Sequence, residues 1–346
     1  MKKFLSLALA LILMFSLVAT VAAEGYIAVI SKGEQHQFWQ TVRKGCTDAA
    51  EKYGVDYFYY GPPSEADIAL QVEALKNELA KGPMALALAA LDTEAVLGEL
   101  SELFERGIPV IGFDSGVPNA PEGYIWATAS TNNTNAGALA ADEIFKLEAF
   151  QAKLAAATPA APLLVVVLTQ DATSESVTSR TTGFVNKMRE LVGVASVTGH
   201  VRWADEVADA PVVIDVNIAA TPGDVDVTNA ATAALNKEPA VVFCSNEGTV
   251  KGLLAATGDG SELASGGRFD GLIVAGFDAG AAQKNAVRQG WFVGSVTQDP
   301  YMIGFLAVEL AYLAANGEPV ADADTGAKWY TAANIDDPDI RDLVYD

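Results

Sequence analysis

Short apolar runs alternate with longer stretches of helical periodicity along almost the whole chain. The runs lack the polar and apolar alternation of a strand with one wet face, so they fit strands that are buried on both sides. Glycines follow several helical stretches where a left-handed residue would end a helix. The order predicts an α/β fold with parallel sheets covered by helices on both faces. The predicted strands are 26–30, 55–60, 84–91, 110–113, 163–168, 197–201, 240–244, 272–277 and 292–296, and the predicted helices are 38–53, 67–81, 93–106, 135–147, 180–191, 227–235, 247–256, 279–289 and 301–316.

A six-residue pattern occurs once in each half of the chain. Residues 111–116 read IGFDSG and residues 275–280 read AGFDAG, each at the carboxyl end of a predicted strand. Two lobes with the same arrangement of strands and helices are therefore expected. The length of 346 residues is enough for about two domains. The polar stretch 128–135 marks the seam, and the Ala- and Pro-rich stretch 149–162 is interpreted as an insertion or a helix extension. The predicted first lobe comprises 24–128 and 300–325, the second comprises 129–299, and the tail 326–346 crosses back over the hinge.

The first 23 residues differ in composition from the rest. Lys2 and Lys3 precede an apolar run, and small residues at 20–23 precede Glu24. This pattern predicts a secretory signal peptide over 1–23. The alternative is a retained anchor, since residues 4–23 are as long as a bilayer span requires.

Composition excludes some partners. Hydrophobic residues make up 51% and charged residues 19%, which excludes disorder for most of the chain. Lys and Arg number 22 against 44 Asp and Glu, a net charge of −22, and removal of Lys2 and Lys3 with the signal leaves 20 against 44, or −24. Nucleic acid is therefore not expected as a partner, because it is bound by clusters of Lys and Arg.

The cysteines and histidines give no sign of a metal or redox site. Cys46 and Cys244 are expected to be buried as small hydrophobic residues rather than paired, and no C-x-x-C motif is present. His36 and His200 lack the spacing of zinc ligands. No cofactor is implied.

The residues that follow the predicted strands are rich in acids, amides and aromatics. Ligands of open parallel sheets bind beyond the carboxyl ends of the strands. Planar polar groups can bridge neighbouring hydroxyls while an aromatic face covers C–H groups, so this mixture suits a carbohydrate. Any single acid fits a helix N-cap equally well, but Asp114 and Asp278 occupy equivalent strand ends in the two halves. The residues that follow the predicted strands, and that are therefore candidates for ligand binding, are 31–39, Asp92, 114–115, 170–180, 245–247, Asp278 and Gln298.

Five segments resemble the type I periplasmic sugar-binding proteins of ABC importers, the group that includes ribose- and galactose-binding proteins. The resemblance runs from about residue 26 to the C-terminus. It implies two doubly wound parallel-sheet lobes joined by a multi-strand hinge. It also implies a monomeric exported receptor, soluble in the periplasm, that captures a monosaccharide or polyol and delivers it to a membrane permease. The segments are 37–39 with Gly45, 109–114, 180–184, 243–247, and 276–278 with 297–300.

The resemblance also implies which residues contact the ligand. Phe38 and Trp39 would sandwich or edge the sugar ring, and His36 takes the place of a hydrogen-bonding Asn of the ribose binders. Ser115 stands where the ribose binders carry an Arg, so the pocket of this chain would lack the charged, bidentate guanidinium group at that position. The only candidate for an aromatic from the second lobe is Trp203. The remaining implied contacts are Asp114 from the first lobe and Arg180, Asn246, Asp278 and Gln298 from the second lobe and hinge.

Other function classes are less well supported. G-x-S-x-G, Walker A and G-x-G-x-x-G loops are absent from the sequence. A glycosidase could use Asp114 and Asp278 as paired carboxylates. A repressor-type sensor would need a basic helix-turn-helix before the first strand, where the predicted signal peptide lies. A nucleoside or signalling molecule could also occupy the same fold.

Overall fold

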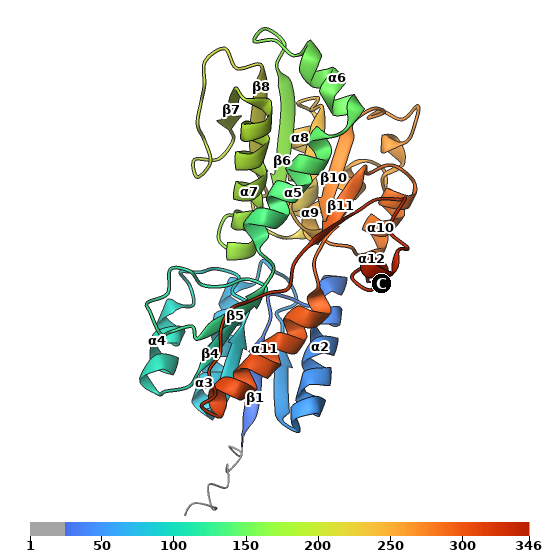
Figure 1. Ribbon diagram of the computed structural model, residues 1–346. Helices are drawn as coiled ribbons and strands as arrows, with labels where there is room; N and C mark the ends of the chain where they lie inside the picture. Colours follow the sequence, from blue (N-terminus) through green and yellow to red (C-terminus); the bar gives the residue numbers. More distant parts are fainter. Residues whose placement is uncertain (1–24, 346) are drawn as a thin grey trace, which may run out of the picture.

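The computed structural model describes residues 25–345, so the predicted signal peptide 1–23 lies outside the described residues. Within this range the strands form two sheets, one in each of two lobes (Figure 1). Neighbouring strands pair in parallel, except that β13 is antiparallel to β11. The first sheet has the order β12-β5-β4-β3-β1-β2, with β1 (Tyr26–Ile30), β2 (Asp56–Tyr60), β3 (Ala85–Leu88), β4 (Val110–Phe113), β5 (Ala127–Ser130) and β12 (Ala323–Asp324). The second has the order β13-β11-β10-β9-β6-β8-β7, with β6 (Leu163–Thr169), β7 (Ala195–Thr198), β8 (Val212–Ile218), β9 (Val241–Cys244), β10 (Ile273–Phe277), β11 (Gly294–Thr297) and β13 (Lys328–Tyr330).

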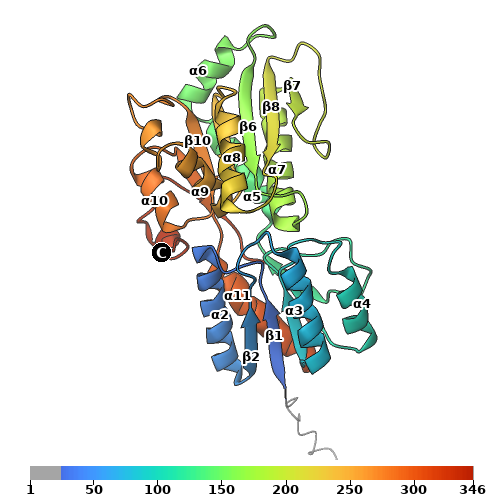
Figure 2. The same ribbon diagram turned by 180° about the vertical axis from the view of Figure 1, so that it is seen from behind.

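Helices cover both faces of each sheet (Figures 1 and 2). In the first lobe α2 (Gln37–Tyr53) and α11 (Pro300–Ala315) lie on one face, and α3 (Ile68–Lys81) and α4 (Leu97–Glu105) on the other. In the second lobe α5 (Asn133–Phe145) and α7 (Glu175–Val192) lie on one face, with α8 (Asp224–Leu235), α9 (Glu247–Ala256) and α10 (Ala281–Arg288) on the other. The short helices are α6 (Glu148–Ala156), η1 (Ser261–Leu263) and α12 (Pro338–Arg341). No helix within residues 25–345 is long and apolar enough to cross a membrane.

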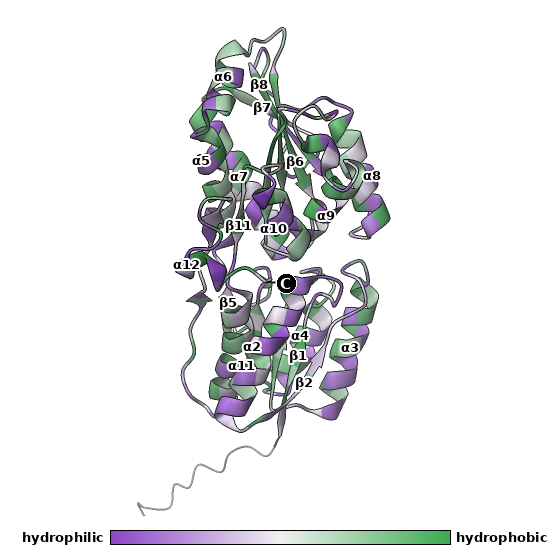
Figure 3. Cartoon of the chain, turned by 90° about the vertical axis from the view of Figure 1, so that its right-hand side faces the viewer, coloured by the Kyte–Doolittle hydropathy of each residue, from purple (hydrophilic) through white to green (hydrophobic). Residues whose placement is uncertain are grey.

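The apolar residues of these elements point inward. Hydrophilic colour lies along the outer faces of α2 and α3, and hydrophobic colour gathers on the strands (Figure 3). Successive residues of β1 alternate between two apolar clusters, with Val29 in the cluster under α2 and Ile30 in the cluster under α3. β1 thus buries both of its faces, as its near-continuous apolar run predicted.

Four glycines let two pairs of helices touch at the backbone. A Cβ atom on Gly45 of α2 or on Gly304 of α11 would lie 2.0 Å from a carbonyl oxygen of the facing helix. In the second lobe Gly137 of α5 and Gly183 of α7 form the same arrangement, at 2.1 and 2.0 Å. Neither pair of helices could approach so closely with any larger side chain at these positions. The equivalent contacts support the common plan of the two lobes that the repeated hexapeptide predicted.

The chain passes between the two sheets three times within the described residues: after β5, after β11, and between β12 and β13. The first and third crossings lie side by side. Thr131 Oγ1 donates to the Gly326 carbonyl over 3.1 Å, and the Asn132 amide donates to Asp324 Oδ1 over 3.0 Å. These crossings form the predicted multi-strand hinge.

Two strands were not predicted. β5 runs through the predicted lobe boundary at 128 as far as Ser130, and it was read as a polar seam because Thr128 and Ser130 are polar. β8 was missed because Asp215 and Asn217 interrupt its apolar run. Asp215 is accommodated in the strand by ion pairing to Lys237 Nζ at 2.5 Å.

The other differences are smaller. The stretch 149–162 contains a separate helix, α6, and α7 begins at Glu175, five residues before its predicted start, because its first turn is polar. The short strands β12 and β13 and helix α12 were also not predicted. Both cysteines are buried and unpaired, which confirms their expected state.

Candidate functional site

A pocket lies between the lobes, at the carboxyl ends of strands from both sheets. Its volume is about 20 Å³, room for about one water molecule. A monosaccharide is much larger, so the lobes have to separate before one can enter. The residues that line the pocket come from both lobes and from the hinge, and are Lys32, His36, Phe38, Trp39, Glu65, Asp114, Val177, Arg180, Asn246, Glu247, Asp278 and Gln298.

Eight of the nine residues expected to bind a ligand line this pocket, and Ser115 does not. The Ser115 hydroxyl accepts a hydrogen bond from the Ser176 amide of the second lobe at 3.3 Å, so it joins the lobes beside the pocket. Among the lining residues that were not predicted, Lys32 and Glu247 fall inside strand-end stretches that were identified. Glu65 follows β2, whose carboxyl end was not considered. Extending the strand-end rule to every strand would have found it.

Asp114 and Asp278 occupy equivalent places. Each directly follows a central strand, β4 or β10, and each has a left-handed backbone, with φ of 55° and 78°. Non-glycine residues rarely adopt this conformation, and they concentrate at functional sites. The repeated hexapeptide therefore encodes one backbone turn used twice, which directs a carboxylate toward the pocket from each lobe.

The wall formed by the first lobe is a buried network of charges. Lys32 Nζ lies 3.1 Å from Asp114 Oδ2, and both side chains are almost fully buried. Burial alone would lower the pKa of Lys32, but the nearby carboxylates of Asp114 and Glu65 outweigh it and raise the pKa. Burial alone would raise the pKa of Glu65, and there the Lys32 charge outweighs it and holds the pKa below its usual value. Both groups are therefore charged at neutral pH.

The wall formed by the second lobe is organised around Asp278. Its Oδ2 accepts from the Glu247 amide at the start of α9 (2.9 Å), and its Oδ1 accepts from Gln298 Nε2 (2.7 Å). Arg180 Nη1 lies 3.9 Å from Oδ2, and the guanidinium lies over the Phe277 ring. Burial nevertheless raises the pKa of the Asp278 carboxyl above its usual value, against the charge of Arg180.

Several of the polar side chains also hold the local structure. Asn246 is the N-cap of α9, where its oxygen accepts from the Thr249 amide, and its Nδ2 donates to Gln170 Oε1 at 2.8 Å. Arg180 Nε donates to Asn133 Oδ1 at 2.8 Å. Asp92 accepts from the Glu94 and Ala95 amides in the turn before α4 and does not line the pocket, and the N-cap of α4 is Val96, so Asp92 is a turn residue rather than a helix N-cap.

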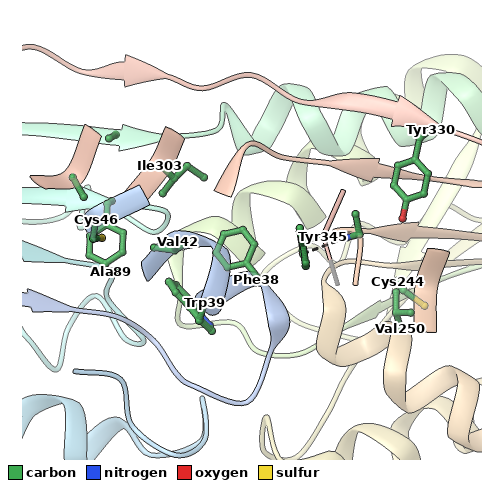
Figure 4. Packing of buried hydrophobic residues seen from close by; sticks show 14 of the residues in the cluster. Phe38, Trp39, Val42, Cys46, Ala89, Cys244, Val250, Ile303, Tyr330 and Tyr345 are labelled. Carbon is green, nitrogen blue, oxygen red and sulfur yellow. Dashed lines mark hydrogen bonds between the residues drawn. The ribbon is translucent and has the colours of Figure 1, made fainter. Parts of the chain in front are cut away.

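Two aromatic rings form the apolar part of the pocket. Phe38 and Trp39 meet edge to face with their centroids 5.0 Å apart, and Trp39 Nε1 donates to Glu65 Oε1 at 2.8 Å. Tyr345, near the C-terminus, packs against Phe38 from the second-lobe side (Figure 4). A continuous apolar cluster therefore reaches from α2 in the first lobe to α9 in the second.

Trp203 does not belong to the pocket, which corrects its candidacy as the second-lobe aromatic. It is buried in the cluster under α5 and α7, and its Nε1 donates to Thr182 Oγ1 at 2.9 Å. Its ring also lies against His200, with centroids 5.5 Å apart. Trp203 thus packs within its own lobe.

Direct hydrogen bonds join the two lobes around the pocket. Gln170 Nε2 donates to Glu65 Oε2 over 2.7 Å, and Lys32 Nζ donates to Ser176 Oγ over 3.0 Å. A third contact joins Lys251 Nζ of the second lobe to His36 Nδ1 of the first, at 3.2 Å. The structure therefore shows the lobes in a closed arrangement.

Comparisons with known proteins agree with this geometry. The sequence model of one family, described as periplasmic binding protein domain, matches residues 27–319. The ribose import binding protein RbsB of Salmonella typhimurium is 25% identical over 326 residues, covering 92% of this chain and 95% of that protein. A solved structure named ABC transporter, LacI family transcriptional regulator, from Brachyspira murdochii is 40% identical with a TM-score of 0.77, covering 94% of this chain and 99% of that one. A carbohydrate transporter solute binding protein from Agrobacterium radiobacter, in complex with D-arabinose, is 26% identical with a TM-score of 0.73, covering 93% and 99%.

Proposed function

Because this chain belongs to the family of periplasmic binding protein domains, we propose that it is an exported receptor that captures a monosaccharide or polyol between its lobes and delivers it to an ABC permease. The observation that carries the proposal is the pocket itself. Acids, amides, an Arg and two aromatic rings meet there from both lobes and the hinge. The ribose of the Salmonella relative and the D-arabinose of the Agrobacterium structure support the same ligand class.

Both walls of the pocket take part in recognising the sugar. Phe38 and Trp39 cover C–H groups, while Asp114 and Asp278 accept hydrogen bonds from hydroxyls. Arg180 donates with the part of its guanidinium that faces the pocket. Because Asp114 lies on the first lobe and Arg180 and Asp278 lie on the second, a sugar binds both lobes at once and favours the closed state.

Closure then serves as the signal to the permease. The hinge crossings let the lobes rotate as rigid bodies, and a permease that recognises only the closed pair responds to the loaded receptor. The receptor acts as a soluble monomer after cleavage of the signal at 1–23, in the periplasm or an equivalent space. The mass of the exported protein and its light scattering in solution test cleavage and monomeric state.

The glycosidase alternative has less support. Asp114 Oδ2 lies 3.1 Å from the buried Lys32 Nζ, so its carboxylate is held in a structural ion pair in the pocket wall. The family is one of binding proteins. Incubation with aryl glycosides tests this alternative, and release of the phenol at a rate that falls in Asp114→Asn would establish it.

A ligand screen tests the binding function. Thermal unfolding is measured with aldoses, ketoses and polyols, and with nucleosides as the competing class. A ligand present at about 100 times its dissociation constant stabilises the folded state by about 2.7 kcal/mol. A shift with sugars that is lost in Arg180→Ala supports the proposal, whereas a shift with nucleosides alone moves the function to the non-sugar alternative.

A further inference from the structure

The buried side-chain atoms of the pocket that lack a hydrogen-bond partner among the described residues are all oxygens. They belong to Glu247, Gln298 and Asp114. Asp114 Oδ2 is faced by Lys32, and Glu247 Oε1 lies 2.9 Å from Lys251 Nζ. Glu247 Oε2 and Gln298 Oε1 accept no hydrogen bond within residues 25–345. The protein therefore offers these positions to a ligand that donates hydrogens.

The two residues that carry these oxygens both contact the Asp278 carboxylate. Glu247 donates its amide to Asp278 Oδ2, and Gln298 donates its side-chain amide to Asp278 Oδ1. Glu247 is itself only 2% exposed. A small donor group beside Asp278 can therefore reach both Glu247 and Gln298.

The pocket also carries an excess of negative charge. Its lining contains two cations, Lys32 and Arg180, against the four carboxylates Glu65, Asp114, Glu247 and Asp278, which leaves 2 − 4 = −2. Lys251 at the rim reduces this to −1. His36 does not add to the negative charge of the pocket. Its Nδ1 lies 3.2 Å from Lys251 Nζ, and its Nε2 lies 3.9 Å from Glu65 Oε1. Uncompensated buried charge costs free energy, so a cationic ligand would be favoured.

The other carboxylates already have donors. Glu65 accepts from Trp39 and Gln170, Asp114 faces Lys32, and Asp278 accepts two hydrogen bonds. Among the described residues neither buried oxygen of Glu247 accepts a hydrogen bond; like Asp114, which faces Lys32, this carboxylate is paired with a lysine, Lys251. A hydroxyl donates one hydrogen, whereas an ammonium donates up to three and supplies a positive charge.

We propose that the ligand is an amino sugar or amino polyol whose ammonium lies against Glu247 and Gln298. This inference rests on the sugar-binding function proposed above and narrows its ligand class. Glu247 then determines specificity, because it distinguishes an ammonium from the hydroxyl of the parent sugar. Asp114 and Arg180 bind the hydroxyls that both ligands share.

Calorimetric titration of matched ligand pairs tests the proposal. Glucose, galactose and mannose are compared with their 1-, 2- and 6-amino-deoxy derivatives and with the N-acetylated forms, which lack the positive charge. We expect at least one amino sugar to bind about tenfold tighter than its parent, as a charged hydrogen bond permits, and its N-acetyl form to lose that gain. Glu247→Gln should abolish the preference, so that the amino sugar and its parent bind the variant with equal affinity.

A matched variant controls for charge. Glu105→Gln removes the same charge from an exposed site on α4 and should keep the preference. The amino-sugar proposal is refuted if the parent sugars bind wild type as tightly as every amino derivative does. The proposed sugar-binding function would still stand in that case. If no member of either set binds, the amino-sugar proposal fails, and the thermal screen over aldoses, ketoses and polyols decides sugar binding separately. Should Glu247→Gln not fold, the wild-type comparison alone still decides.

Discussion

Gln170 of the second lobe donates a hydrogen bond to Glu65 of the first lobe over 2.7 Å, with both side chains buried. Separation of the lobes would leave Glu65 with its bond to Trp39 alone. Gln170 Oε1 also accepts from Asn246, so one amide links the first lobe to the cap of α9. The pocket walls are therefore coupled to closure by a side chain that does not line the pocket.

Removal of this link should shift the lobes toward the open state. Gln170→Ala is expected to weaken sugar binding by about tenfold, because a hydrogen bond to a charged group contributes roughly 1.5 to 3 kcal/mol. In small-angle scattering the wild type should contract on adding sugar, and the variant should contract only at higher sugar concentration. Gln151→Ala, on the surface of α6, should behave as wild type. A wild-type scattering curve that stays fixed as tight binding saturates would contradict hinge closure.

Replacement of Asp278 by Asn should raise stability at neutral pH. The folded-state pKa of Asp278 is raised by burial, so its ionised form costs stability above that pKa. The advantage of the variant should shrink as the pH falls from the folded-state pKa toward the unfolded-state value of about 3.9, below which the carboxyl is protonated in both states. Gln298 can rotate its amide so that its unpartnered Oε1 accepts from the new Asn. Sugar binding should fall because the charged acceptor is lost.

Urea unfolding from pH 4 to 7 measures this effect, with Asp56→Asn at an exposed strand position as the control. A variant that is less stable than wild type at pH 7 would show that the ion pair with Arg180 outweighs burial. Normal sugar binding in Asp278→Asn would instead make Asp278 a structural residue.

Trp39→Phe should separate packing from hydrogen bonding. The ring is retained but Glu65 loses the donor at 2.8 Å, so the free energy of unfolding should fall by about 1.5 to 3 kcal/mol. Trp39→Ala should cost more, about 3 to 5 kcal/mol, because Trp39 is 2% exposed. Trp126 is 47% exposed, so Trp126→Phe should change stability by less than about 0.5 kcal/mol. Equal effects of Trp39→Phe and Trp126→Phe would rule out a structural role for the indole donor.

Alanine at the helix contacts should be strongly destabilising. The Cβ of Gly304→Ala would overlap the Val42 carbonyl, whose oxygen lies 2.0 Å from it, and α2 and α11 would have to separate. We expect a loss of about 1 to 3 kcal/mol or more, as for overpacked cores. Gly98→Ala in α4 meets open space and should stabilise by up to about 1 kcal/mol through helix propensity. Thermal unfolding compares the two, and a harmless Gly304→Ala would show that the crossing can adjust.

The C-terminal tail should influence affinity without touching the ligand. Tyr345 packs on Phe38, and its hydroxyl accepts from the Ala279 amide next to Asp278 at 3.3 Å. Tyr345→Ala should therefore weaken sugar binding several-fold, chiefly through faster release, because the Phe38 ring and the Asp278 turn lose support. Tyr124→Ala, which removes a ring stacked on Phe104 within the first lobe, should leave affinity unchanged. Unaltered release kinetics in Tyr345→Ala would limit the tail to a packing role.

The parts of the fold that were predicted from sequence are those with uniform apolar runs. The β1 and β4 strands were located to the residue because each is buried along its length. β8 was missed because its buried Asp215 is tolerated only where Lys237, distant in the sequence, can pair with it. Such a tertiary contact cannot be read from the local sequence pattern. The edge strands β12 and β13 are too short for any periodicity to register.

The prediction of the site from the sequence was limited in a similar way. The repeated hexapeptide and the resemblance located Asp114 and Asp278, and the structure brings both to one pocket. The ion pair between Lys32 and Asp114 could not be predicted, since it depends on the side-chain directions of two separate strand ends. Ser115 was misplaced because backbone position alone does not tell whether a hydroxyl faces the ligand or the other lobe.

The discontinuous layout of the lobes has a consequence for biosynthesis. The apolar side of α2, with Val42 and Cys46, is covered by α11, whose residues are made only after strands β6 to β11 of the second sheet. The second sheet likewise receives its edge strand β13 after α11. A nascent chain that still lacks its last fifty or so residues cannot complete either core, and stays loosely folded until translation ends. For an exported receptor of the kind proposed, this delay keeps the polypeptide in a form that can be threaded through a secretion channel.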